Sequence, residues 1–329
     1  MFFPFNNLST ELALEIIRIA ASPDFVETPN SSRPYYTTAL SLTSVSYAVR
    51  RATMPRLLHT VVLSSAPHLL AFIRSILLQR QHQKNHSRLA LDYKKLVRRF
   101  WSTECWEPVV DEAPDDPLNY SLLYEIIRGV ESLGLNFRSL HLLYNGLASA
   151  NAKPSEDWSC QRVTFAGSFW RWRPLMSTSE GLTFLGRISH LVIWIPNHDS
   201  YPLFDDQSPV PNWIEHVPFA MMPNLTYVAF PLLSNRIRHE ARGSFHTPTE
   251  MVVYTAPCTS KPDPTIFKRW ALGPDPLVHG IVIPFRVLPI FSGDKPVDLN
   301  WEVAYVQGEG DGAWERAEKV KKLRGNDLE

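Results

Sequence analysis

The chain has 329 residues, a length that corresponds to about two domains and allows a sizeable hydrophobic core. Hydrophobic residues make up 44% of it and aromatic residues 12%, which excludes the apolar-poor composition of disordered chains. Lysine plus arginine equals aspartate plus glutamate, at 33 each, so no net charge attracts nucleic acid or an anionic membrane over a distance.

Apolar periodicity predicts four helices, and the abundance of proline predicts that they are joined by many ordered loops. Ser9 or Thr10 is the expected N-cap of the first helix. Pro55 is expected to close the second helix, and Gly134 stands where a glycine commonly follows the end of the fourth. The predicted helices span about 9–21, 38–53, 67–83 and 118–133.

Short apolar runs predict six strands. Most of these runs are apolar on successive residues, which is typical of strands that are covered on both faces. The class expected from alternating helices and strands is α/β. The predicted strands are 60–63, 139–144, 190–195, 225–230, 251–254 and 280–283.

Three of the predicted strands share a sequence pattern. Leu140, Leu191 and Leu225 each follow an apolar residue three positions earlier, which resembles a leucine-rich L-x-x-L-x-L turn. Their spacing exceeds the ~20 to 29 residues of ordinary leucine-rich repeats, so any repeat is irregular. We expect parallel strands with these leucines in one buried column, and helix 118–133 packed on the sheet. The alternative is three core strands of an ordinary α/β domain.

No residue pattern in the sequence supports an enzyme. His82 and His86 have the i, i+4 spacing of a zinc pair on a helix, but they lie in a polar segment without an acidic ligand, which favours a solvated surface. The glycine run 308–312 lacks both the P-loop lysine and the dinucleotide-binding spacing. The acid pairs 115–116 and 205–206 lie in proline-rich loops. We therefore expect no catalytic residue, no cofactor and no metal ion.

The cysteines and the N-terminal segment indicate the compartment. Cys105, Cys160 and Cys258 lie far apart and form no C-x-x-C pair, which argues against disulfides and a thiolate metal site. The first residues lack the basic region of a signal peptide. No apolar run approaches the ~18 residues of a membrane-spanning helix. We expect an intracellular protein, cytoplasmic or nuclear, with no membrane partner.

Two further groups of residues could form a binding surface. Eight basic residues between Arg74 and Arg99 could bind nucleic acid, but the aromatic pair Phe100 and Trp101 comes only at the end of the stretch. A solvated helix face is therefore favoured, and no nucleic-acid partner is expected. Tryptophans could anchor a partner, although large aromatics more often fill a core. The tryptophans in question are Trp101, Trp106, Trp170 and Trp172.

Residues 8–63 resemble an F-box. The family opens with L-P-x-E-L and a helix, continues with a second helix that ends in V-S and a tryptophan, and closes with a P-x-x-L segment before a strand. Segments 8–12, 40–46 and 52–58 match these parts in order. Ser9 replaces the family's proline, and Val49 replaces its tryptophan. The whole chain is also similar to the expanded F-box-like families of mushroom-forming fungi.

The F-box resemblance implies a helical module that docks on the adaptor subunit of a cullin-RING ubiquitin ligase, while the rest of the chain binds an unknown protein substrate. It predicts an F-box-like module at 1–65, an irregular leucine-rich-like α/β region at 66–307, and a C-terminal helix with a polar tail at 308–329. The loop 202–211 and Trp213 are candidates to meet a partner. The adaptor-binding residues that it implies are Leu8, Leu12, Ile16, Pro55 and Leu58.

Three alternatives to a ligase subunit stay open at this point. The chain could be an interaction scaffold unconnected to a ligase. It could be a hydrolase or transferase whose active site is scattered along the sequence. The N-terminal helices could also be a cap that seals the end of an α/β domain.

Overall fold

The computed structural model describes residues 8–22, 36–63, 65–102, 120–150, 158–166, 172–194, 216–232, 248–255, 279–286, 289–292 and 295–299. Several features predicted from the sequence lie outside these residues. They are the acid pairs 115–116 and 205–206, the loop 202–211 with Trp213, Trp106, Trp170, Cys105, Cys258, the glycine run 308–312 and the C-terminal segment 308–329.

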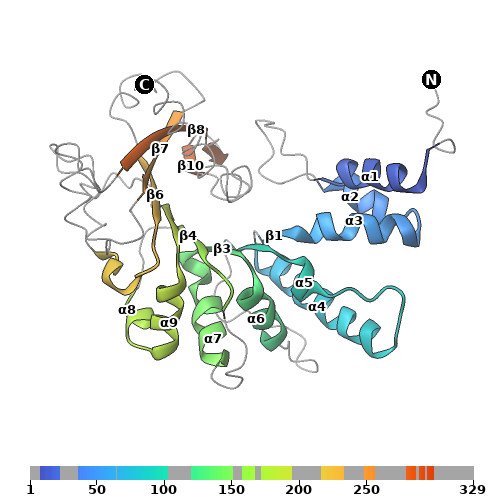
Figure 1. Cartoon of the computed structure of the whole chain (residues 1–329), viewed down its shortest axis with the longest axis horizontal. Coiled ribbons are helices and arrows are strands. Elements are labelled where there is room, and N and C mark those ends of the chain that lie inside the picture. The colour runs from blue at the N-terminus through green and yellow to red at the C-terminus, as the bar shows by residue number, and fades with distance from the viewer. Residues whose placement is uncertain are drawn as a thin grey trace.

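One sheet dominates the described part of the chain, and its eight strands follow one another in chain order (Figure 1). The first six are parallel to one another, and the last two join them antiparallel. A separate antiparallel pair is formed by β9 (Pro289–Ser292) and β10 (Lys295–Leu299). The strands of the large sheet are β1 (Thr60–Leu63), β2 (Arg99–Ser102), β3 (Ser132–Asn136), β4 (Arg162–Ala166), β5 (His190–Trp194), β6 (Tyr227–Leu232), β7 (Pro248–Thr255) and β8 (His279–Arg286).

Helices cover one face of the parallel strands. Figure 1 shows α4, α6, α7 and α9 on the same side of the sheet, and α4 contacts α6, α6 contacts α7, and α7 contacts α9. The chain is therefore an α/β protein in which successive strand and helix units lie side by side. The helices that follow β1 are α4 (Ala66–Lys84), α5 (Tyr93–Leu96), α6 (Tyr120–Gly129), α7 (Leu140–Ala150), α8 (Arg173–Met176) and α9 (Ser179–Arg187), with short 3-10 turns at η2 (Phe137–Ser139) and η4 (Phe219–Met221).

The hydrophobic core lies between these helices and the sheet. One residue from each parallel strand forms a continuous row across the sheet. Residues paired across parallel strands point to the same face of a sheet, and all six side chains of this row are buried. Helix residues such as Ile73, Leu123 and Leu185 complete the core. The row consists of Val61, Phe100, Leu133, Val163, Leu191 and Val228.

In the described residues before the sheet there are three helices, α1 (Thr10–Ala20), α2 (Thr37–Thr43) and α3 (Tyr47–His59). Both α1 and α2 pack on α3, which continues directly into β1. Ser9 caps α1, as predicted, by accepting a hydrogen bond from the Leu12 amide at 3.3 Å. Ser46 caps α3 in the same way through the Val49 amide, at 3.3 Å. We call α1, α2 and α3 together the N-terminal module.

The predicted second helix is divided in two. The chain leaves the helical conformation after Thr43 and starts α3 at the Ser46 cap, because a serine side chain competes for backbone donors. Pro55 was expected to end this helix, and that prediction is wrong, since Pro55 lies inside α3. Pro55 and Arg51 are both exposed, so water can satisfy the Arg51 carbonyl that the proline leaves without a donor.

The strand predicted at 139–144 is wrong, because these residues belong to η2 and α7. An apolar run of this length fits a buried helix as well as a strand, and Leu140, Leu142 and Leu143 are buried on the helix. The predicted fourth helix ends at Gly129, and β3 begins at Ser132. Leu140 therefore opens no strand, and the expected column of three leucines does not form.

Candidate functional site

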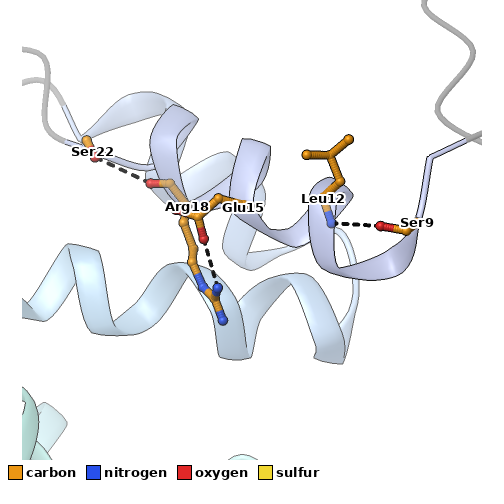
Figure 2. Close-up of polar contacts among 5 residues, drawn as sticks. All are labelled: Ser9, Leu12, Glu15, Arg18 and Ser22. Atoms are coloured by element: carbon orange, nitrogen blue, oxygen red, sulfur yellow. Dashed lines mark hydrogen bonds and ion pairs between the residues drawn. The ribbon is translucent and has the colours of Figure 1, made fainter.

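The first helix is held at the protein surface. No residue of α1 is buried, although the whole helix is described. Its local stability comes from the Ser9 cap, from an ion pair between Glu15 and Arg18 at 2.9 Å, and from the Ser22 hydroxyl, which donates to the Arg18 carbonyl at 3.3 Å (Figure 2). These polar contacts fix the ends of α1 without covering its apolar side chains.

Apolar side chains are exposed on the N-terminal module to an unusual degree. Leu12 and Ile19 are 51% and 65% exposed, and their spacing of seven residues puts them on one face of α1. Leu40 in α2 and Val45 after it are 55% and 67% exposed. Of the nine large apolar side chains exposed among the described residues, five lie between Leu12 and Tyr47. We call Leu12, Ile19, Leu40 and Val45 the exposed apolar surface.

The opposite side of the module faces inward. Ala21 and Ala39 are buried and Ile17 is half-buried, within or next to the helices that contact α3. The half-buried Ile16 lies at the edge of the face that carries Leu12 and Ile19. The Leu12 side chain points away from the long helix drawn beneath α1 (Figure 2). The module is thus packed on its α3 side and leaves a second apolar side in solvent, where large apolar clusters on soluble proteins mark interaction sites.

The structure separates the five residues that the F-box resemblance implies for adaptor binding. Leu12 is exposed on α1, while Leu8 and Ile16 are half-buried. Pro55 is exposed on α3, and Leu58 is buried in the hydrophobic core. Leu58 therefore supports the fold from inside and cannot contact a docked partner directly.

The F-box resemblance did not single out Ile19, Leu40 or Val45, which the structure shows to be exposed. Ile19 continues the periodic face of Leu12 and Ile16, so the helical pattern already contained the signal for it. Leu40 and Val45 lie on either side of the end of α2. Because the sequence predicted one continuous helix here, the periodicity placed these two side chains on the wrong faces.

A second group of polar side chains lies on the sheet face opposite the helices. His190 pairs across the sheet with Arg162 on β4 and Tyr227 on β6. Its ring stacks on Tyr227 with 4.6 Å between centroids and an interplanar angle of 21°. Burial, and then the charge of Arg162, lower the pKa of His190 to about 4. His190 is therefore neutral at physiological pH and cannot act there as a cationic acid.

The buried thiol and the histidine pair do not form reactive sites in the described residues. Burial raises the pKa of Cys160 to about 12, which disfavours the nucleophilic thiolate. His86 lies beyond the end of α4 with a φ of 50°, so His82 and His86 do not share one helix. The described residues contain no group of three or more His, Cys, Asp or Glu that could hold a metal ion.

The basic stretch between Arg74 and Arg99 is not one solvated helix face, so that prediction is wrong. Its residues are divided among α4, the segment after it, α5 and β2. Arg80 forms an ion pair with Glu125 at 3.7 Å and Arg98 with Glu131 at 3.0 Å, whereas Arg99 is buried. Trp101 and Trp172 are also buried, as expected of aromatics that fill a core.

Comparisons with known proteins found no match: no family model, no curated protein and no solved structure matches the chain. In the helices that the structure describes, no segment is both long and apolar enough to cross a membrane.

Proposed function

We propose that this protein is a substrate receptor of an SCF-type cullin-RING ubiquitin ligase, located in the cytoplasm or nucleus. The N-terminal module docks on the adaptor subunit, and the α/β region binds a protein substrate. The observation that carries the proposal is the exposed apolar surface on the very segment, residues 8–63, that resembles an F-box. The described residues contain no group of three or more His, Cys, Asp or Glu that would favour a metal site instead.

The exposed apolar surface is a suitable docking site on energetic grounds. Burying a leucine, isoleucine or valine side chain contributes about 1.5 to 3 kcal/mol, and the exposed apolar surface has four such side chains. Association costs translational freedom and side-chain order, so a partner must cover several of them together. An apolar groove on the adaptor would meet this requirement, and removal of two anchors should then abolish most of the affinity.

We propose further that the α/β region is an irregular leucine-rich-like array. Support comes from six parallel strands in chain order with helices along one face, the arrangement expected of stacked α/β units. On the opposite sheet face, the half-buried Arg162 and His190 are polar residues at the starts of β4 and β5. That face is the proposed substrate side of the receptor.

The first test is a binding measurement between the full chain and a purified ligase adaptor subunit. The double variant Leu12→Asp, Ile19→Asp should bind the adaptor at least about 100-fold more weakly, because two anchors of at least about 1.5 kcal/mol each are lost. The matched control is Leu182→Asp, which changes an exposed leucine on α9, outside the module. Circular dichroism and thermal unfolding check that all variants remain folded.

Equal adaptor affinity in the wild type and the double variant would overturn the docking proposal. Affinity purification from the native cell provides an independent test, scored for adaptor and cullin peptides. If the exposed apolar surface recovers other proteins and no ligase subunit, the chain is an interaction scaffold of another kind.

A further inference from the structure

A groove of about 450 Å³ lies between α3 and the segment that joins α4 to α5. It is separate from the exposed apolar surface, because it contains none of Leu12, Ile19, Leu40 and Val45. Residues 87–92 form one wall, together with Lys95 and Leu96 at the end of α5. The residues that line the groove from α3 are Tyr47, Arg50, Arg51 and Pro55, and those that line the other wall include Arg88, Leu89, Leu91, Asp92 and Lys95.

Side chains of α4 hold the loop wall in place. The Leu91 amide donates to Oε1 of Gln79 at 2.9 Å, and the Leu91 carbonyl accepts from Nε2 of Gln83 at 3.1 Å. The Leu89 amide donates to the Ser87 hydroxyl at 3.2 Å. Gln79 is itself buried, so this contact is part of the fold. The wall is therefore organised before any ligand binds, which reduces the entropic cost of binding.

The groove carries an excess of positive charge. Its lining contains four cations, Arg50, Arg51, Arg88 and Lys95, and one carboxylate, Asp92. Asp92 forms an ion pair with Lys95 at 3.4 Å. Within the described part of the chain, Arg50, Arg51 and Arg88 form no ion pair. Three guanidinium groups thus surround one concave site, and guanidinium groups match carboxylates in geometry.

Apolar side chains line the same groove as these cations. Tyr47 and Leu89 line the groove and are among the exposed large apolar residues, and Pro55 is also exposed there. A ligand that fits both features carries carboxylates and apolar side chains on one short chain. A nucleic-acid strand instead needs a track of cations that follows its backbone. Pro55, Leu89 and Leu91, which line the groove and offer no aromatic ring on which a base could stack, therefore favour a peptide.

We propose that this groove binds an acidic linear segment of a partner protein, with carboxylates on Arg50, Arg51 and Arg88 and an apolar side chain between Tyr47 and Leu89. This interaction is independent of adaptor docking and gives the chain a second protein-binding site. Exposed ion pairs are screened by salt, so the affinity of the groove for its ligand falls as ionic strength rises.

The test uses the full chain and a fluorescein-labelled dodecapeptide of alternating glutamate and leucine, measured by fluorescence anisotropy. The wild type should show saturable binding, and the double variant Arg51→Gln, Arg88→Gln should bind about tenfold more weakly. The matched control is Arg56→Gln, Arg173→Gln, which removes two exposed arginines outside the groove and should bind as the wild type does. The variant Leu12→Asp, Ile19→Asp should also retain peptide binding, which separates this test from that of adaptor docking.

Three results would overturn the proposal. The first is equal binding of a peptide in which glutamine replaces every glutamate. The second is equal loss of affinity in the groove variant and the control variant. The third is displacement of the peptide by oligo(dT) or inorganic phosphate at the peptide's own concentration, which would identify a nucleic-acid or phosphate site instead.

Discussion

At the residue scale, the environment of His190 on the sheet lowers the pKa of its imidazole ring. The folded protein holds the pKa of His190 at about 4, below the ordinary value of 6.5, mainly because the ring is largely buried. The neutral ring also accepts or donates a hydrogen bond at Nδ1 with the Ser189 hydroxyl, at 2.8 Å. Folding therefore favours the neutral form, and protonation of His190 opposes folding.

This difference in pKa predicts an acid-sensitive contribution to stability. Because the folded pKa is below the unfolded one, the contribution of His190 is present above pH 6.5 and is lost as the pH falls from 6.5 to about 4. The loss should be roughly 1 to 2 kcal/mol after allowance for partial solvent exposure. Urea unfolding at pH 7.5, 5.5 and 4 measures it in the wild type and in His190→Phe, which keeps an aromatic ring against Tyr227.

The free energy of unfolding of His190→Phe should decline less than that of the wild type across this range. His59, whose pKa burial also lowers, is present in both proteins, so its effect cancels in the comparison. Parallel pH curves for the two proteins would contradict the assignment to His190.

At the element scale, the contact between α8 and α9 depends on one glycine. A Cβ atom at Gly181 would overlap the backbone of Leu175, whereas a Cβ at Gly186 would meet nothing within 4 Å. The Gly181 amide also donates to the Thr178 hydroxyl that caps α9, at 3.1 Å. The two helices can approach this closely only because residue 181 has no side chain.

We therefore expect opposite effects from two alanine substitutions in the same helix. Gly181→Ala should lower the free energy of unfolding by about 2 kcal/mol or more, because the backbone of α8 must shift. Gly186→Ala should leave it unchanged or raise it by up to about 1 kcal/mol, since alanine is the better helix former. Thermal and urea unfolding of both variants provide the measurement, and a neutral Gly181→Ala would refute the close contact.

The sequence predicted some elements of this fold better than others, for physical reasons. The helices α1 and α4 have clear starts, and β1 and β5 are compact apolar runs, so periodicity identified them. It did not identify β2, which begins with the buried Arg99. The row of strand contacts depends on register between strands far apart in sequence, and no local pattern specifies that register.

The candidate docking surface was predictable only in part. A helical pattern gives the face of α1, so Leu12 could be assigned from the sequence. The burial of Leu58 was not predictable, because a leucine near a module boundary can point toward a partner or toward the core, and only its packing decides between them. The groove is beyond sequence reasoning, since it joins Arg51 on α3 with Arg88 on a segment that Gln79 and Gln83 hold in place.

At the scale of the whole molecule, the N-terminal module and the sheet differ in how they are packed. No residue of α1 is buried, whereas β3 is buried throughout its length. Local opening should therefore require less free energy at α1 than at the central strands. The proposed adaptor would add the packing that α1 lacks in the isolated chain.

Hydrogen exchange followed by mass spectrometry can measure this difference. Amides of α1 should exchange at least about tenfold faster than those of β3 and β4, because little burial opposes the opening of α1. Addition of the adaptor should slow exchange in α1 and leave the central strands unchanged. Equal protection of α1 and β3 in the free chain would show that the surface helix is stabilised by contacts other than those described.

The chain order of the parallel strands has a consequence for biosynthesis. Each of β2 to β6 pairs with the strand synthesised just before it. The sequence separation of paired strands therefore stays short for a parallel sheet, which keeps contact order low. A nascent chain can therefore add one strand and helix unit at a time as it leaves the ribosome. The N-terminal module is synthesised before any strand of the sheet, and each later strand can add to the edge formed by the strand before it.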